Sequence, residues 1–432
     1  MLLITTDSSI RKRGLTMDKI IIEGGNKLIG EVNISGFKNA ALPIIIGTVL
    51  SGDKCRIENL PMISDVSNLT KIMGMLGADV KLDRNGILDI DTNNIEKCVL
   101  IDEITRKMRA SYYLLGAGLS RFKEVEVLYP GGCDIGVRPI DQHIKGFEAL
   151  GAKVEIDHGV IKCSAEKLVG SKIYLDVVSV GATINIMMAA TMAEGTTIIE
   201  NAAKEPHIVD VANFINTMGG DVRGAGTDVI KINGVEKLHG CNYSVIPDQI
   251  EAGTYMIMAA GTKGNLLIKN VIPVHLEPVT AKLREVGVEV IEYGDSIQID
   301  GDFDLKNVNI KTLPYPGFPT DLQQPMTALL STVKGTSIVT ETVSESRFKY
   351  IDELKRMGAD ISVDGSTAIV KGVDKLMGAE VRATDLRAGA ALVVAGLMAE
   401  GTTAIGEIQH IERGYEDLVF KLKKIGANVK KV

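Results

Sequence analysis

The residues of this sequence best suited to chemistry lie in a glycine-rich loop at 130–139. Three glycines surround Cys133, and Arg138 follows five residues after the cysteine, directly before Pro139. Glycine gives the backbone conformational freedom, and proline stiffens the exit of the loop. A mobile loop that carries a thiol and a permanent cation could close over an anionic substrate. An ordinary surface turn has the same composition, so the loop alone leaves both interpretations open.

Charged and capping residues also stand where helices are expected to begin. A helix N-terminus offers unpaired N–H groups and a positive dipole, which suit phosphate. Arginine binds phosphate or carboxylate through two parallel hydrogen bonds. Taken alone, each residue could equally be a plain helix cap or a solvated surface charge. The residues are Lys38, Asn39, Arg109, Ser179, Asp321, Asp385 and Arg387, together with Arg347 and Arg413 in loops equivalent to the one that holds Arg138.

The elements that must position these residues form an internal repeat. A glycine followed by a strand pattern recurs at positions 77, 151, 219, 287, 358 and 426, a period of about 70 residues. We expect each glycine at the C′ position of a helix, where a positive φ is needed. Each copy also contains an almost uncharged apolar run, which predicts a buried helix. These runs cover 40–50, 110–119, 182–193, 252–260, 322–333 and 388–399.

Six such units predict an α/β protein of βαβαββ-type units, three per domain, with the apolar helices inside and the sheets outside. We expect one domain at 38–245 and a discontinuous one at 17–37 plus 246–432, because the opening strand at 19–34 has no helix of its own. Two chain crossings, near Phe37 and Ile246, would then border an interdomain cleft, where ligands often bind. Residues 1–16, before a second plausible start at Met17, are expected to be a disordered extension.

The composition excludes several function classes. The net charge is −7, Trp is absent and aromatic residues make up 4% of the chain, which argues against binding to nucleic acid or to an anionic membrane. No apolar stretch of 18 residues predicts a membrane span. Five widely spaced cysteines and six histidines show neither disulfide nor metal-ligand spacing. We therefore expect a cytoplasmic protein without a structural metal.

The ordered motifs resemble the UDP-N-acetylglucosamine 1-carboxyvinyltransferases, one family of enolpyruvyl transferases. The similarity extends from about Met17 to Val432, and it rests on 34–40, 108–111, the Cys133 loop, 318–321, 341–348, 383–387 and 413–416. The resemblance implies a two-domain inside-out α/β barrel. It also implies transfer of enolpyruvate from phosphoenolpyruvate to the 3′-hydroxyl of UDP-N-acetylglucosamine, the first committed step of peptidoglycan precursor synthesis. No metal or organic cofactor is implied.

The resemblance also implies roles for particular residues. Gln142 stands where the family often has leucine, and Val177 stands where it can have lysine. The resemblance therefore does not determine which residues contact the uridine. Phosphoenolpyruvate would be held by Lys38, Asn39, Cys133, Arg138, Arg347 and Arg413, with Asp385 and Arg387 in support. The nucleotide sugar would be held by Asn39, Arg109, Arg138, Pro139, Ile140, Asp141, Gln142, Val177, Val178, Ser179, Val180, Gly181, Asp321 and Val343.

Addition followed by elimination needs a proton donor, a base and cations that stabilise developing charge. We predict Cys133 as the general acid and covalent nucleophile, with a pKa lowered by Arg138 and neighbouring cations, and Asp321 as the base toward the sugar hydroxyl. Lys38 and Arg413 complete the predicted catalytic set. Two alternatives stay open, transfer to shikimate 3-phosphate and a catalytically silent paralogue. The sequence does not indicate an oligomeric state.

Overall fold

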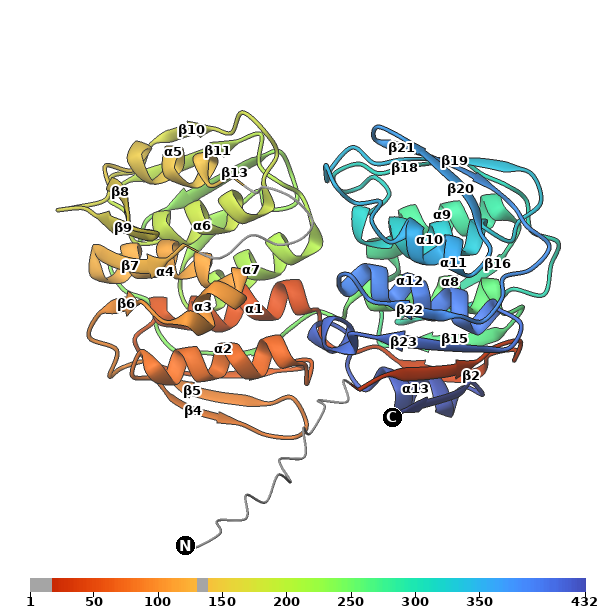
Figure 1. Ribbon diagram of the computed structural model, residues 1–432. Coiled ribbons are helices and arrows are strands. Elements are labelled where there is room, and N and C mark those ends of the chain that lie inside the picture. The colour runs from red at the N-terminus through yellow and green to blue at the C-terminus, as the bar shows by residue number, and fades with distance from the viewer. Residues whose placement is uncertain (1–17, 130–138) are drawn as a thin grey trace, which may run out of the picture.

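The computed structural model describes residues 18–129 and 139–432, apart from the side chains of residues 106 and 107. Two bodies of similar construction lie side by side, one formed mainly by the first half of the chain and the other mainly by the second half (Figure 1). The predicted extension at 1–16 and most of the Cys133 loop lie outside the described residues. No helix of the described residues has the length and apolar character needed to cross a membrane.

Each body contains three four-stranded sheets. In the first body their strand orders are β14-β3-β5-β4, β6-β7-β9-β8 and β10-β11-β13-β12. The strands are β3 (Lys54–Glu58), β4 (Asp79–Leu82), β5 (Leu88–Asp91), β6 (Cys98–Leu100), β7 (Glu124–Leu128), β8 (Lys153–Asp157), β9 (Val160–Ser164), β10 (Lys172–Tyr174), β11 (Thr196–Glu200), β12 (Asp221–Arg223), β13 (Val229–Asn233) and β14 (Asn242–Ser244).

The second body repeats the same strand orders, as β2-β15-β17-β16, β18-β19-β21-β20 and β22-β23-β1-β24. Its strands are β1 (Ile20–Glu23), β2 (Ile29–Asn33), β15 (Asn265–Lys269), β16 (Glu289–Tyr293), β17 (Ser296–Asp300), β18 (Ile310–Lys311), β19 (Thr336–Thr340), β20 (Asp360–Asp364), β21 (Thr367–Lys371), β22 (Glu380–Arg382), β23 (Thr402–Gly406) and β24 (Asn428–Lys431). The predicted six-unit α/β architecture is thus confirmed.

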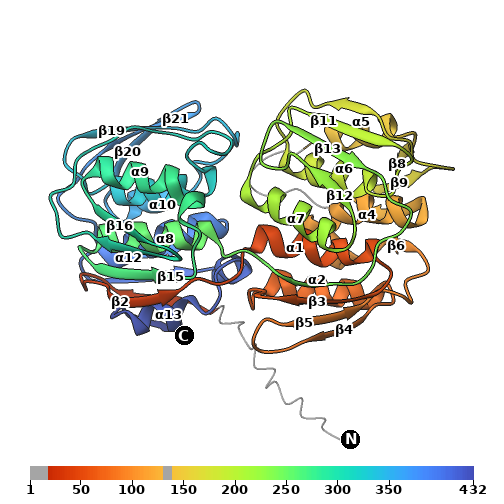
Figure 2. The ribbon, with the colours of Figure 1, turned by 180° about the vertical axis from the view of Figure 1, so that it is seen from behind.

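The apolar runs form the buried helices that their composition predicts, and the sheets lie outside them (Figures 1 and 2). Their ends fall within a few residues of the predicted ones. These inner helices are α1 (Lys38–Gly47) with η1 (Thr48–Leu50), η2 (Arg109–Tyr112) with α4 (Tyr113–Phe122), α6 (Val180–Ala190), α8 (Gln249–Gly261), α10 (Thr320–Leu330) and α12 (Leu386–Met398).

A second helix in each unit contacts the strand that follows it. These are α2 (Ser64–Met75), α5 (Asp141–Ala149), α7 (Pro206–Thr217), α9 (Glu277–Val286), α11 (Ile351–Arg356) and α13 (Leu418–Lys424), and the remaining helices are α3 (Glu103–Lys107), η3 (Pro273–Leu276) and η4 (Ile408–Arg413). The glycine after each second helix has a positive φ, between +93° at Gly151 and +107° at Gly287, as its predicted C′ position requires.

The two opening strands complete sheets of the second body. Strand β1 lies between β23 and β24, antiparallel to both, and β2 runs parallel to β15. The chain then crosses to the first body and later returns beside its own outward path, where Phe37 N donates to Ile246 O at 2.7 Å. The domain boundaries at 38–245 and at 17–37 plus 246–432 stay a prediction, and this strand pairing supports them.

Candidate functional site

One cluster of charged residues joins the two bodies around Asp65, which lies in the first turn of α2. Lys38, at the start of α1, places Nζ 2.7 Å from Asp65 Oδ2. Arg413, at the end of η4 in the second body, donates from Nε to Asp65 Oδ1 at 2.9 Å and from Nη2 to Oδ2 at 3.3 Å. Two of the predicted catalytic cations thus share one buried carboxylate as their counter-ion.

Electrostatics couple this cluster to the second body. Burial lowers the pKa of Lys38, the charge of Asp65 opposes that shift, and the positive charges of Arg413 and Arg387 lower the pKa further. Burial would raise the pKa of Asp65, but the ion pairs to Lys38 and Arg413 outweigh it and hold that pKa below its ordinary value. Three cations therefore lie close enough to repel one another, an arrangement that an anionic ligand would stabilise.

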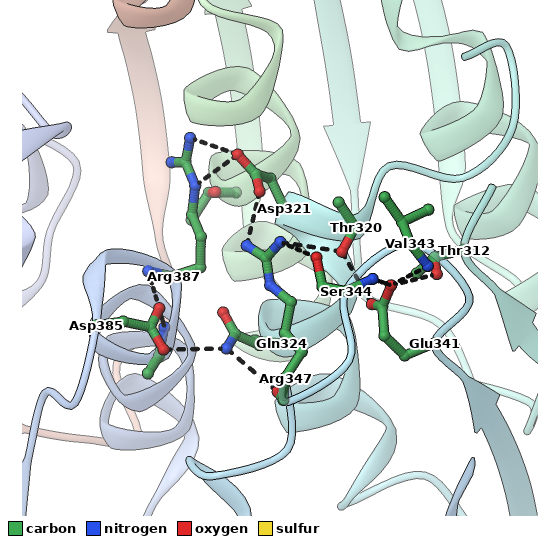
Figure 3. Close-up of polar contacts among 12 residues, drawn as sticks. Thr312, Thr320, Asp321, Gln324, Glu341, Val343, Ser344, Arg347, Asp385 and Arg387 are labelled. Atoms are coloured by element: carbon green, nitrogen blue, oxygen red, sulfur yellow. Dashed lines mark hydrogen bonds and ion pairs between the residues drawn. The ribbon is translucent and has the colours of Figure 1, made fainter. Parts of the chain in front are cut away.

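A second cluster is centred on Asp321, in the first turn of α10 (Figure 3). Arg347 Nη2 donates to Asp321 Oδ1 at 2.7 Å, and Arg387 donates to Oδ2 from Nε at 3.2 Å and from Nη2 at 3.1 Å. Burial would raise the pKa of Asp321, but the two guanidinium groups outweigh it and hold the pKa well below the ordinary range. Asp321 is thus an ionised carboxylate in this arrangement.

Both arginines keep donors that the described residues leave unsatisfied. Arg347 is 4% exposed and Arg387 is 3% exposed, yet neither Nε of Arg347 nor Nη1 of Arg387 has a hydrogen-bond partner within the described part of the chain. Buried donors without partners are costly unless a ligand or water satisfies them. The helix starts nearby are capped by acidic residues, Asp385 at α12 and Asp248 at α8, whose side chains accept backbone N–H groups.

The position of Arg347 depends on Glu341, which is 3% exposed. Glu341 Oε1 accepts from Thr312 Oγ1 and from Val343 N, each at 2.8 Å, and Oε2 accepts from Thr320 Oγ1 at 2.9 Å (Figure 3). Thr320 Oγ1 in turn accepts from Arg347 Nη1 at 3.0 Å. The side chain of Val343 is exposed while its N–H is held by Glu341, and its contact with the nucleotide sugar stays a prediction.

The residues expected to hold the nucleotide half lie at the starts of α5 and α6 in the first body. Gln142 is buried, donates to Asp141 Oδ2 at 2.8 Å and accepts from Asp176 N at 2.9 Å, which ties α5 to the segment before α6. Ser179 caps α6, because its Oγ accepts from Ala182 N at 3.3 Å. At the start of α5, Pro139 and Asp141 are exposed and Ile140 is buried. In the segment that Gln142 holds, Val177 and Val178 are exposed.

Arg109 and Gly181 border the same region. The guanidinium of Arg109 lies 5.8 Å from the ring centroid of Tyr112, and Tyr112 lies 5.8 Å from the ring of His143. A Cβ on Gly181 would lie 3.1 Å from His143 Nε2, so the start of α6 approaches α5 closely. Val180, the first residue of α6, is half-buried. Asn185 of α6 locks this arrangement, because its Nδ2 donates to Tyr112 O at 2.9 Å and lies 3.0 Å from His143 Nδ1.

The structure brings most predicted residues into two regions, but not every prediction is tested. Asn39 is half-buried directly after Lys38. Cys133 and Arg138 lie outside the described residues, so their roles stay predictions. Sequence reasoning missed Asp65 and gave no role to Glu341, because acidic residues at a helix start or a strand end are common on protein surfaces. Among the described residues, no group of three His, Cys, Asp or Glu side chains could hold a metal ion.

Comparison with known proteins finds relatives that are named as carboxyvinyltransferases. A family model described as EPSP synthase (3-phosphoshikimate 1-carboxyvinyltransferase) matches residues 22–422. The chain is 60% identical over 414 residues to UDP-N-acetylglucosamine 1-carboxyvinyltransferase of Clostridium botulinum, covering 96% of this chain and 99% of the relative. It is 58% identical over 416 residues to UDP-N-acetylglucosamine 1-carboxyvinyltransferase 2 of Clostridium acetobutylicum, with the same coverage.

Solved structures show the same architecture. The enolpyruvyl transferase NikO from Streptomyces tendae superposes with a TM-score of 0.87 at 26% sequence identity, covering 96% of this chain and 99% of that one. EPSP synthase from Acinetobacter baumannii superposes with a TM-score of 0.77 at 19% identity, covering 96% of this chain and 100% of that one, which supports the fold alone.

Proposed function

The chain belongs to the EPSP synthase family of carboxyvinyltransferases, and from that premise we propose that it transfers enolpyruvate from phosphoenolpyruvate to the 3′-hydroxyl of UDP-N-acetylglucosamine and releases phosphate. The assignment of UDP-N-acetylglucosamine as the acceptor rests on the 60% identity, over 96% of the chain, to a relative named for that reaction. We further propose that the reaction takes place in the cytoplasm and supplies peptidoglycan precursors.

The charge arrangement supports a small trianionic substrate such as phosphoenolpyruvate. Lys38 and Arg413 from one cluster and Arg347 from the other present cations at helix starts and adjoining loops. The unsatisfied Nε of Arg347 is a donor available to a phosphate or carboxylate oxygen. When the substrate arrives, its oxygens compete with Asp65 for Lys38 and Arg413, because both cations are already held at one carboxylate.

The reaction itself is an addition followed by an elimination. The sugar oxygen bonds to C2 of phosphoenolpyruvate while C3 accepts a proton; C3 then loses a proton as the bond from C2 to the phosphate oxygen breaks. Cys133 supplies the proton to C3, and Asp321 accepts the proton of the hydroxyl. Asp321 is a weak base while both arginines hold it. A substrate anion that draws Arg347 away raises the pKa of Asp321 and makes it a better base.

Two substitutions test these roles through phosphate release. We expect Asp321→Asn and Cys133→Ser each to lower kcat by about 100-fold or more, because each removes a proton-transfer group. Asp360→Asn, on the exposed strand β20 of the same body, is the matched control and should retain wild-type turnover. Alkylation with fosfomycin should inactivate the wild type through Cys133. Near-normal turnover in either variant removes that residue from its role.

The retained residues also bear on the alternatives. A silent paralogue would have no reason to keep Asp321 between two buried arginines that retain unsatisfied donors. Transfer to shikimate 3-phosphate needs the same anion site, so the choice of acceptor decides between the two reactions.

A further inference from the structure

The segment at 412–416 contacts the first body at three neighbouring points, and only one of them belongs to the proposed reaction. Arg413 pairs with Asp65, as described above. On one side of that pair, Ser64 Oγ donates to the carbonyl oxygen of Glu412 at 3.4 Å. On the other side, Met62 N donates to Glu416 Oε1 at 3.1 Å. Glu416 follows Arg413 by three residues. It holds the backbone of Met62, which precedes Asp65 by three residues.

The second carboxylate oxygen of Glu416 is anchored where the chain crosses between the bodies. Ser35 Oγ donates to Glu416 Oε2 and accepts from Lys421 Nζ at 2.6 Å. Lys421 also pairs with Glu251 Oε1 at 2.7 Å, and Glu251 Oε2 accepts from Ser35 N at 2.9 Å. Glu251 is 2% exposed and lies in the first turn of α8. The anchor of Glu416 is therefore a half-buried polar network in the second body, which ends at the buried Glu251.

Glu416 lies on a side of the segment that is open to a cavity. A cavity of about 330 Å³ opens beside it, lined by residues of both bodies that include Ser35, Asn59 and Glu416. A hydrogen bond to a charged acceptor is stronger than one between neutral groups, so the bond from Met62 N to Glu416 can set the position of a short loop. Tyr415 is buried and its hydroxyl lies 2.9 Å from Thr254 Oγ1, and Lys431 pairs with Glu412, so these contacts hold the rest of the segment. Loss of Glu416 would therefore loosen the side of the segment that faces Met62 and the cavity.

We propose that Glu416 is a positioning residue that sets Arg413 for phosphoenolpyruvate. Glu416 joins the half-buried Ser35–Lys421–Glu251 network to the segment before Asp65, and so it holds the guanidinium of Arg413 beside Lys38. The role rests on the proposed function, because Arg413 is taken there to bind the substrate anion. A displacement of about 1 Å at such a group can change rates by up to about 100-fold.

The kinetic test compares Glu416→Ala with the wild type. We expect the KM for phosphoenolpyruvate to rise about tenfold, while the KM for UDP-N-acetylglucosamine changes less than about twofold, because the loss acts through Arg413. Glu416→Gln should recover part of the effect, since its amide oxygen can still accept from Met62 N. Glu400→Ala, which breaks the exposed ion pair to Lys375 in the same body, is the control and should behave as the wild type.

A second readout does not depend on turnover. Hydrogen exchange at the Met62 amide should be faster in Glu416→Ala and unchanged in Glu400→Ala. Unchanged exchange at Met62 overturns the proposal, and so does faster exchange with an unchanged KM for phosphoenolpyruvate, which would leave Glu416 a purely structural role. Failure of the proposed function is recognised separately, because the wild type itself would then release no phosphate from the two substrates.

Discussion

At the scale of single residues, the site is built from carboxylates that each hold two cations. Asp65 holds Lys38 and Arg413, and Asp321 holds Arg347 and Arg387. A shared counter-ion keeps buried cations paired without neutralising all of their charge, so a strong electrostatic attraction for an anionic substrate remains. In the proposed reaction, these cations would exchange a carboxylate partner for the substrate.

His143 gives a pH dependence at the same scale. Burial, together with the smaller effect of the Arg109 charge, lowers the pKa of His143 to about 4. The folded state therefore favours neutral His143, whose Nδ1 can accept from Asn185 Nδ2. The stability that this preference contributes is present above pH 6.5 and is lost as the pH falls from 6.5 toward 4, because the unfolded chain binds the proton first.

The expected size follows from the two pKa values. Between pH 7.5 and pH 4.5 the His143 contribution should fall by about 2–3 kcal/mol. His143→Gln should lose less stability over that range than the wild type, as measured by urea unfolding at both pH values. His158→Asn, at an exposed position, is the matched control and should keep the wild-type pH dependence. An equal loss in His143→Gln and the wild type would contradict this account.

At the scale of elements, close packing between inner helices fixes where the functional residues at their N-terminal ends lie. A Cβ on Gly116 of α4 would lie 2.3 Å from the backbone oxygen of Asn185 in α6. Gly116 N donates to Asn185 Oδ1 at 2.8 Å, so the backbone of α4 is bonded directly to a side chain of α6. This contact sets the distance between the starts of α4 and α6, where Arg109 and Ser179 lie.

Gly116→Ala should therefore destabilise the fold by about 1–3 kcal/mol or more, because the backbone of α6 cannot yield as a flexible side chain would. Gly74→Ala in α2 is the matched control. It meets nothing within 4 Å, so it should be neutral or stabilise by about 0.5–1 kcal/mol through helix propensity. Denaturant unfolding measures both, and equal midpoints for the two variants would show that the helices can separate without cost.

The repeat explains how much of the fold could be predicted from the sequence. Helix–glycine–strand patterns are local, so the six glycine positions and the apolar runs predict both the elements and their order. The partner of Asp65 could not be predicted in this way. Asp65 and Arg413 are 348 residues apart and meet only because the two bodies come together. The same holds for Ser35 and Lys421, whose contact depends on where the chain crosses between bodies.

At the scale of the whole molecule, the two bodies are joined by adjacent chain crossings and by the 412–416 segment. The crossings meet at Phe37 and Ile246, and the segment brings Arg413 to the Lys38 cluster. Lys38 and Arg413 therefore come from different bodies, and the anion site that we propose exists only while the bodies are together. This dependence couples substrate binding to the relative placement of the two halves of the chain.

The central claim is that this anion site serves a transfer to UDP-N-acetylglucosamine. The most direct measurement is the initial rate of phosphate release from phosphoenolpyruvate with UDP-N-acetylglucosamine, with shikimate 3-phosphate, and with no acceptor, combined with the mass of the product. The account predicts release with UDP-N-acetylglucosamine alone, and a nucleotide sugar that has gained one carboxyvinyl group. Release that depends on shikimate 3-phosphate, or no release with either acceptor, would contradict it.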